Sequence, residues 1–139
     1  MANVFDVVIS GGGLSGLLTA IGLLNEAPEL SIAIIEPIEK SDLQAPQDNF
    51  DGRCLALSYG SLQLLQHWGV WPELKPLAWP IKTIVTSDRG HAGKTIMKAD
   101  DYQLNAMGYV SEMRNMGMVF QSVLRRLENR TDTRVAWFN

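Results

Sequence analysis

Three glycines near the N-terminus, Gly11, Gly13 and Gly16, have the spacing G-x-G-x-x-G of a phosphate-binding turn. In such a turn the first glycine permits the sharp bend, and the second lets the backbone approach a pyrophosphate. The third lets the following helix pack closely on the strand, and the start of that helix attracts an anion. Leu14 and Ser15 complete the motif. These residues indicate a nucleotide-binding turn.

The segments on either side of the glycines have the pattern of a strand, a helix and a second strand. The apolar, β-branched run 5–9 is typical of a buried parallel strand. Apolar residues from Leu14 to Leu24 recur at the spacing of one helix face, and residues 26–28 end that helix. Residues 31–36 predict the second strand, so residues 4–36 form a βαβ unit.

Glu36 ends the second predicted strand and follows Gly16 by 20 positions, where a carboxylate that binds an adenosine ribose is expected. An acid at this place favours a free ribose 2′-hydroxyl, and therefore FAD or NAD over NADP. The alternative is an ordinary strand–helix turn followed by a solvated acid. Because strand, glycines, helix, strand and acid occur in register, we favour a dinucleotide that contains adenosine.

Composition limits the class of protein. The 139 residues suffice for one compact domain, and 46% hydrophobic with 19% charged residues argue against disorder. A net charge of −3 offers no electrostatic case for nucleic acid or an anionic membrane. The single cysteine, Cys54, suits a reducing cytoplasm. No apolar run approaches the ~20 residues of a membrane span, and the N-terminal stretch is not expected to be a signal peptide, because it lacks a basic region and is broken by glycines.

The remainder of the chain departs from a simple nucleotide-binding fold. Residues 37–52 are polar and predict a functional loop. Ser58 is expected to cap a helix that runs to about Trp68 and ends at Gly69. A proline-rich connection over 70–80 precedes a predicted hairpin with strands at 81–87 and 92–97. A short strand at 109–113, an amphipathic helix through about 116–127 and a strand at 133–138 follow.

Several of these runs together resemble one enzyme family. The residues that carry the resemblance are Gly11 to Gly16, Glu36 and the runs 51–57, 69–71, 87–93 and 101–104. They resemble the N-terminal part of the FAD-dependent aromatic hydroxylases of the para-hydroxybenzoate hydroxylase type, and within it the ubiquinone-biosynthesis hydroxylases. The resemblance implies an α/β fold: a Rossmann-like βαβ domain that binds FAD or NAD(P), with the start of a β-rich substrate domain. The expected units are 1–75 for the ADP half of FAD, 76–108 for a partial substrate-domain hairpin, and 109–139 for an incomplete return to the first unit.

By the same resemblance, Glu36 holds the adenosine ribose and Arg53 reaches the FAD phosphates or ribose. Asn115 lies where relatives place a polar or basic residue that contacts the cofactor, although arginine is commoner there and Arg114 precedes it. The implied reaction uses NAD(P)H and O₂ to hydroxylate a polyprenylated phenol on the route to ubiquinone. The implied setting is the cytoplasm, with peripheral attachment of the parent protein to the inner membrane and contacts with other ubiquinone-biosynthesis proteins.

Two other functions stay open: an NAD-dependent dehydrogenase of the Rossmann type, and a non-catalytic nucleotide-binding remnant. Members of the resembled family are much longer, so we expect a fragment that is inactive alone. No catalytic or metal-ligating residue is predicted, because His67 and His91 lack an evident partner. Cys54 is expected to be a buried, small hydrophobic residue, and Met113, Met116 and Met118 core or gap-filling residues.

Overall fold

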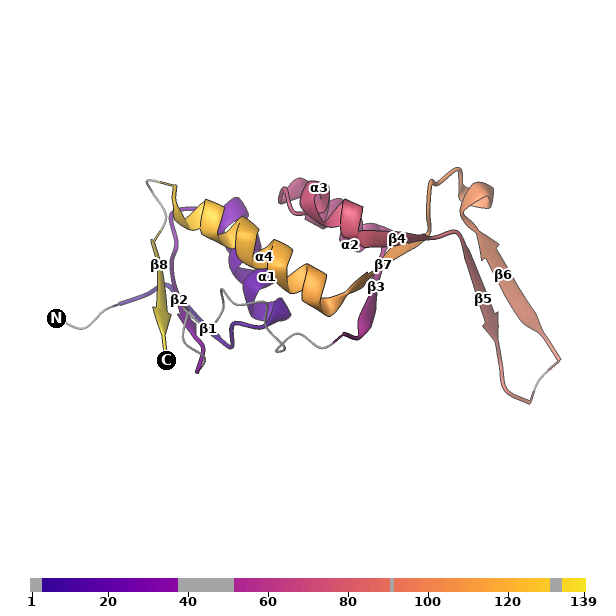
Figure 1. Ribbon diagram of the computed structural model, residues 1–139, viewed down its shortest axis with the longest axis horizontal. Helices are drawn as coiled ribbons and strands as arrows, with labels where there is room; N and C mark the ends of the chain where they lie inside the picture. Colours follow the sequence, from indigo (N-terminus) through magenta and orange to yellow (C-terminus); the bar gives the residue numbers. More distant parts are fainter. Residues whose placement is uncertain (1–3, 38–51, 91, 131–133) are drawn as a thin grey trace.

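The computed structural model describes residues 4–37, 52–90, 92–130 and 134–139. It has an α/β fold, as the sequence predicts (Figure 1). Most of the predicted loop 37–52, His91 and the start of the last predicted strand lie outside the described residues. In chain order the elements are β1 (Val7–Ser10), α1 (Leu14–Glu26), β2 (Ser31–Ile35), β3 (Cys54–Ser58), α2 (Tyr59–His67), α3 (Trp71–Leu74), η2 (Lys75–Leu77), β4 (Ala78–Ile81), β5 (Thr83–Ser87), β6 (Lys94–Lys98), η3 (Ala99–Tyr102), β7 (Gly108–Glu112), α4 (Met113–Glu128) and β8 (Arg134–Phe138).

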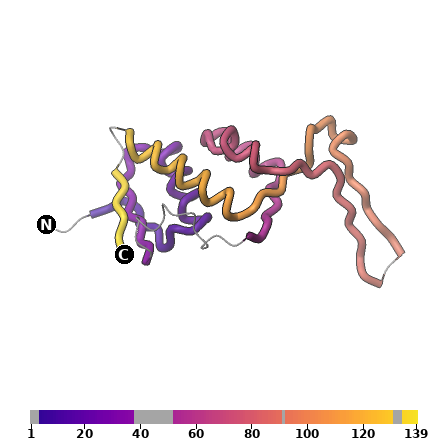
Figure 2. Tube along the Cα trace, viewed as in Figure 1, coloured from indigo at the N-terminus to yellow at the C-terminus, as the bar shows by residue number. Residues whose placement is uncertain are grey.

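A parallel sheet of order β1-β2-β8 forms one end of the molecule. Ile32 of β2 is aligned with Val7 on one side and with Val135 on the other, which makes β2 the central strand. Figure 2 shows the yellow C-terminal segment beside the indigo and purple N-terminal strands. The predicted βαβ unit is confirmed, and the last predicted strand proves to be its third parallel neighbour.

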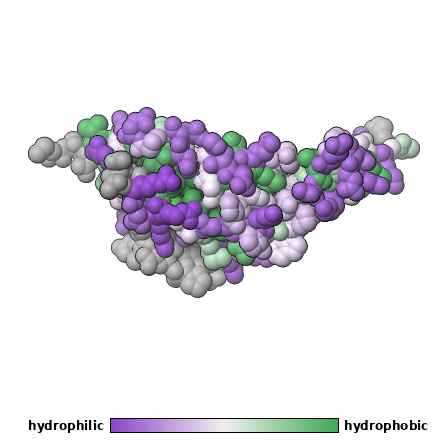
Figure 3. Space-filling model, turned by 90° about the horizontal axis from the view of Figure 1, so that it is seen from above, coloured by the Kyte–Doolittle hydropathy of each residue, from purple (hydrophilic) through white to green (hydrophobic). Residues whose placement is uncertain are grey.

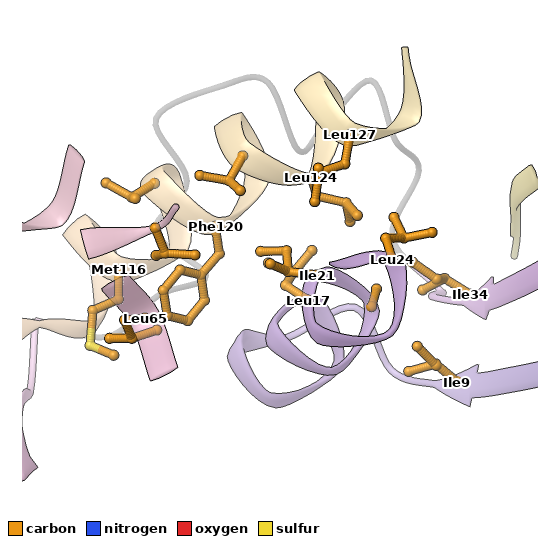
Figure 4. Close-up of a cluster of buried hydrophobic side chains, with 14 of the residues drawn as sticks. Ile9, Leu17, Ile21, Leu24, Ile34, Leu65, Met116, Phe120, Leu124 and Leu127 are labelled. Atoms are coloured by element: carbon orange, nitrogen blue, oxygen red, sulfur yellow. The ribbon is translucent and has the colours of Figure 1, made fainter. Parts of the chain in front are cut away.

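Helices α1 and α4 pack on each other and on one face of this sheet. Leu17 and Ile21 of α1 are fully buried, and Phe120 of α4 is 1% exposed. In Figure 4 the Phe120 ring lies between Met116 and Leu65 on one side and helix α1, with Leu17 and Ile21, on the other. The predicted apolar face of α4 is confirmed by the burial of Met116, Phe120, Val123, Leu124 and Leu127, while Arg125 and Arg126 are exposed.

A second sheet, of order β3-β7-β4, is antiparallel. The sequence did not indicate β3 or β4 as strands: residues 70–80 were expected to be a connection, yet β4 begins at Ala78. Pro80 explains why the pattern misled, since proline weakens a strand prediction but is tolerated on an edge strand. Ser58 caps α2 as predicted, because its hydroxyl accepts a hydrogen bond from Ser61 N at 3.2 Å.

The predicted hairpin is confirmed as β5 paired with antiparallel β6. Ile81, expected to begin its first strand, belongs instead to β4. Figure 1 shows this hairpin extending away from the helices, and its aligned residues Val85 and Ile96 are exposed. In the space-filling view hydrophilic residues cover most of the drawn face, and hydrophobic ones reach the surface in small areas between them (Figure 3).

No helix among the described residues is both long enough and apolar enough to cross a membrane.

The start of the parallel sheet is joined by a cluster of hydrogen bonds between Asp6 and Ser31. The Asp6 carboxylate accepts from the Ser31 hydroxyl at 2.6 Å and from the Ser31 N–H at 2.8 Å, and Asp6 N donates to Ser31 O at 3.0 Å. The hydrogen bond from the Ser31 hydroxyl, followed by the bond from its backbone N–H, lowers the pKa of Asp6 below its ordinary value. The ionised form of Asp6 therefore stabilises the aligned start of β1 and β2.

We predict that Asp6→Asn lowers the free energy of unfolding at pH 7, because a neutral amide oxygen replaces the carboxylate acceptor. Since the folded-state pKa is lowered, the carboxylate contribution is complete above its ordinary value of about 3.9 and disappears as the pH falls through the folded-state pKa. The difference between wild type and variant should therefore shrink toward pH 3. Urea unfolding of both proteins at pH 7 and pH 3 measures this difference in the free energy of unfolding. Glu29→Gln is the control, because it changes an exposed acid. A difference independent of pH would contradict this explanation.

Candidate nucleotide-binding site

The glycine turn between β1 and α1 is built as the motif requires. Gly11 has φ +102°, a conformation that residues with a side chain rarely adopt, and its N–H donates to Ile35 O of β2 at 2.8 Å. A Cβ on Gly16 would lie 1.9 Å from Gly11 O. The first glycine therefore permits the turn, and the third permits the close approach of α1 to it.

A cleft of about 390 Å³ opens at the N-terminus of α1. A Cβ built on Gly13, the N-cap of α1, would have no atom within 4 Å, so this backbone faces open space. Within the described residues no side chain caps the helix, and its first turn holds no acid. Helix N–H groups without a capping side chain favour an anion at such an end. The cleft is lined by Ser10, Gly11, Gly13, Leu14, Ser15, Gly16 and Met113.

Glu36 lies beside this turn, at the end of β2. Its Oε2 atom accepts a hydrogen bond from Gly12 N at 2.6 Å, and its own N–H donates to Phe138 O at 2.7 Å. A Cβ on Gly12 would lie 3.1 Å from both Glu36 Oε2 and the Trp137 ring, so the missing side chain of Gly12, which lies between the first two glycines of the motif, makes room for the carboxylate. The carboxylate is thus held against the turn by strands β2 and β8.

The beginning of α4 approaches the cleft from the other side. Met113, its first residue, lines the cleft, and Met113 N donates to Arg53 O at 2.9 Å. Arg53 is exposed just before β3, and Asn115 is half-buried in the first turn of α4. The structure therefore brings the backbone of Arg53 and the start of α4 to the edge of the cleft. The contacts of Arg53 and Asn115 with a cofactor stay predictions.

Three residues differ from their predicted surroundings, and one of them is Met118, which was expected to be a core or gap-filling residue but is 47% exposed. Met113 was expected in the core but lines the cleft, and the sequence signal that could have revealed this is its place at the junction of β7 and α4. The prediction that Cys54 is buried is wrong: Cys54 is exposed, because little packs on either face of β3, where Leu55, Ala56 and Ser58 are exposed as well. His67 ends α2 as predicted. The described residues contain no group of His, Cys, Asp and Glu that could hold a metal ion.

Known proteins are similar to this chain in sequence. No family model matches the chain. An uncharacterized protein of Synechocystis sp., slr1300, is 34% identical over 139 residues, which covers 98% of this chain and 30% of that protein. The mitochondrial ubiquinone biosynthesis monooxygenase COQ6 of Xenopus tropicalis is 27% identical over 133 residues, covering 93% of this chain and 27% of that protein.

Solved structures agree on the fold. The p-nitrophenol 4-monooxygenase PnpA of Pseudomonas putida DLL-E4 matches with a TM-score of 0.64 at 18% identity, over 99% of this chain and 32% of that one. The chain is similar in sequence and in fold to a part of the flavin-dependent monooxygenases. A second solved structure, the flavin-dependent monooxygenase PieE in complex with FAD and substrate, matches with a TM-score of 0.63 at 10% identity. The chain spans less than a third of the length of these relatives and structures, and 24% in the case of PieE.

We predict that Gly16→Ala lowers the free energy of unfolding by about 1–3 kcal/mol or more, because a methyl group there collides with the Gly11 carbonyl. Gly13→Ala is the matched control: its φ of −73° suits alanine, its Cβ meets no atom, and its cost should stay within about 1 kcal/mol. Denaturant unfolding measures both variants. Equal stabilities would show that α1 does not depend on the close approach at Gly16.

Proposed function

We propose that this chain supplies the ADP-binding part of the FAD site in an aromatic-ring monooxygenase. The observation that carries the proposal is the 2.6 Å hydrogen bond that holds the Glu36 carboxylate to Gly12, beside the open cleft at the start of α1. Here a pyrophosphate would meet backbone N–H groups, and a ribose would meet an acceptor for its hydroxyls. The PieE complex with FAD supports a flavin as the cofactor of the proposed site.

The residues present fit FAD at its nucleotide end. Open space over Gly13 admits the pyrophosphate, and Gly11 to Gly16 supply the backbone around it. Glu36 would orient the ribose, with Arg53 and Asn115 approaching from β3 and α4. When bound, FAD supplies the redox chemistry, while this part of the protein binds and orients it.

For the whole protein, we propose a polyprenylated phenol as substrate, with NAD(P)H as electron donor and O₂ as co-substrate. The named function of the Xenopus relative, ubiquinone biosynthesis, supports this substrate class. We also propose that residues 76–108 belong to a substrate-facing unit, distinct from 1–75 and 109–139. The proposed location is the cytoplasm with peripheral attachment to the inner membrane, where a prenylated substrate and other ubiquinone-biosynthesis proteins would be met.

An NAD-dependent dehydrogenase is the second candidate, because the same turn and acid suit NAD. The topology favours FAD, since the chain leaves β2, forms the β3-β7-β4 sheet and the β5-β6 hairpin, and only then adds β8 beside β2. A simple dinucleotide-binding fold would continue through a crossover helix to its third strand. A non-catalytic nucleotide-binding remnant is the third candidate, and it would retain the same cleft.

We predict that Glu36→Ala weakens FAD binding by this chain about 10- to 150-fold, because a hydrogen bond with a charged partner contributes roughly 1.5–3 kcal/mol. Isothermal titration calorimetry with FAD and with NAD measures the affinity, and flavin absorbance gives a second readout. Glu29→Ala is the control, since it removes an equal charge from an exposed site away from the turn. Unchanged FAD affinity would place the ribose elsewhere, and tight NAD binding without FAD binding would favour the dehydrogenase.

We also predict that the 139-residue chain produces no hydroxylated phenol by itself. Its described residues address the nucleotide end of FAD, whereas hydroxylation requires the reacting ring to be oriented and shielded from water. The assay combines the chain with FAD, NADPH, O₂ and a prenylated phenol, followed by mass spectrometry. Any turnover should consume reductant and release peroxide only. Stoichiometric hydroxylated product would contradict the proposal that this chain binds only the nucleotide end of FAD.

A further inference from the structure

The indole ring of Trp137 in β8 reaches from helix α4 to the glycine turn. Its N–H donates to Oε1 of Glu128, the last residue of α4, at 2.6 Å. At the opposite edge of the ring, Cζ3 would lie 3.1 Å from a Cβ built on Gly12. Trp137 is half-buried and packs against the hydrophobic core. The ring therefore joins the end of α4 to the turn that precedes α1.

The Glu36 side chain meets the ring of Trp137 at Gly12. From the same Cβ on Gly12, Glu36 Oε2 would lie at 3.1 Å and Glu36 Cγ at 3.2 Å. The carboxylate also accepts the hydrogen bond from Gly12 N at 2.6 Å. The carboxylate and the ring edge thus border one small space, which is open because Gly12 has no side chain. Trp137 consequently limits the directions in which the Glu36 side chain can turn.

Strand pairing fixes the positions from which both side chains start. Trp137 is aligned with Ile34 in the parallel pair β2-β8, and Glu36 N donates to the carbonyl oxygen of Phe138, the next residue, at 2.7 Å. A glutamate side chain loses rotamer freedom when a ligand immobilises it. A wall that restricts the side chain before the ligand arrives reduces this entropic cost of binding.

We propose that Trp137 is a positioning residue, which holds the Glu36 carboxylate in place for the ribose, and that Glu128 in turn holds the ring of Trp137. This inference rests on the proposed function, in which Glu36 is the acceptor for the ribose 2′-hydroxyl. Trp137 acts through Glu36 and requires no contact with the ligand. Loss of the ring should therefore reduce discrimination at the 2′-hydroxyl, while the contacts of the pyrophosphate with the glycine turn persist.

The test compares the affinities of ADP and 2′-deoxy-ADP by isothermal titration calorimetry, because these probes share the pyrophosphate and differ in the 2′-hydroxyl. The wild type should bind ADP about tenfold or more tightly than 2′-deoxy-ADP. Trp137→Phe removes the indole N–H and shortens the ring, and it should reduce this preference to about threefold or less. Trp71→Phe is the matched control, since it makes the same change at a half-buried tryptophan that packs against Tyr109. It should keep the wild-type preference.

Variants of Glu128 test the anchor while the ring of Trp137 stays in the chain. Glu128→Ala removes the acceptor of the indole N–H, so it should also lower the preference for ADP. Glu128→Gln retains an acceptor oxygen and should keep the preference close to that of the wild type. Equal preferences in Glu128→Ala and the wild type would overturn the role of the anchor.

A double-mutant cycle with Glu36→Ala separates positioning from a purely structural role of Trp137. Glu36→Ala should bind the two probes equally, and adding Trp137→Phe should leave their ratio unchanged. A Trp137→Phe chain that keeps the wild-type preference, or that loses affinity for both probes by the same factor, would overturn the inference and leave the proposed function intact. A wild type that binds both probes equally, or neither, would overturn the proposed role of Glu36 and this inference with it.

Discussion

The close approach of helix α1 to the glycine turn is the contact on which the functional end of the molecule depends. Gly16 lies so near the Gly11 carbonyl that a single methyl group would occupy the oxygen's space. Because α1 begins this close to the turn, the N-terminus of the helix lies at the cleft. The same turn donates from Gly11 N to Ile35 O, which places the end of β2, and hence Glu36, beside the cleft. The missing side chains at Gly11, Gly12 and Gly16 thus set the positions of the helix, the cleft and the carboxylate.

The sequence was most informative where geometry depends on local residues. Glycine spacing, the apolar face of α1 and the distance to Glu36 were enough to predict the βαβ unit, because each follows from backbone sterics or helical periodicity. The cap of α2 at Ser58 and the hairpin β5-β6 were predictable for the same reason. Local rules also located the last strand, β8.

The pairing of strands that are distant along the chain could not be predicted from the sequence. Nothing in residues 54–58 or 78–81 distinguishes strands from connections, since β3 and β4 exist by pairing with β7. Whether other segments cover the faces of β3 also depends on the folded chain, so the exposure of Cys54 was predicted wrongly. The hydrogen bond from Gly12 to Glu36 and the fit of Trp137 against Gly12 likewise depend on segments that meet only in the folded chain. At the cleft, the glycines and Glu36 were indicated by their spacing, whereas Met113 would have required the junction between β7 and α4 to be recognised.

The central place of β2 has a consequence for the order in which the molecule is made. Its partner β8 is roughly a hundred positions further along the chain, and α4, which covers α1, directly precedes β8. At ribosomal rates of about 5–20 residues per second, this strand follows β2 by about 5–20 seconds. During that interval one edge of β2 and the apolar face of α1 have no native partner. A nascent chain of this protein therefore exposes a strand edge that other chains could pair with until α4 and β8 have been made.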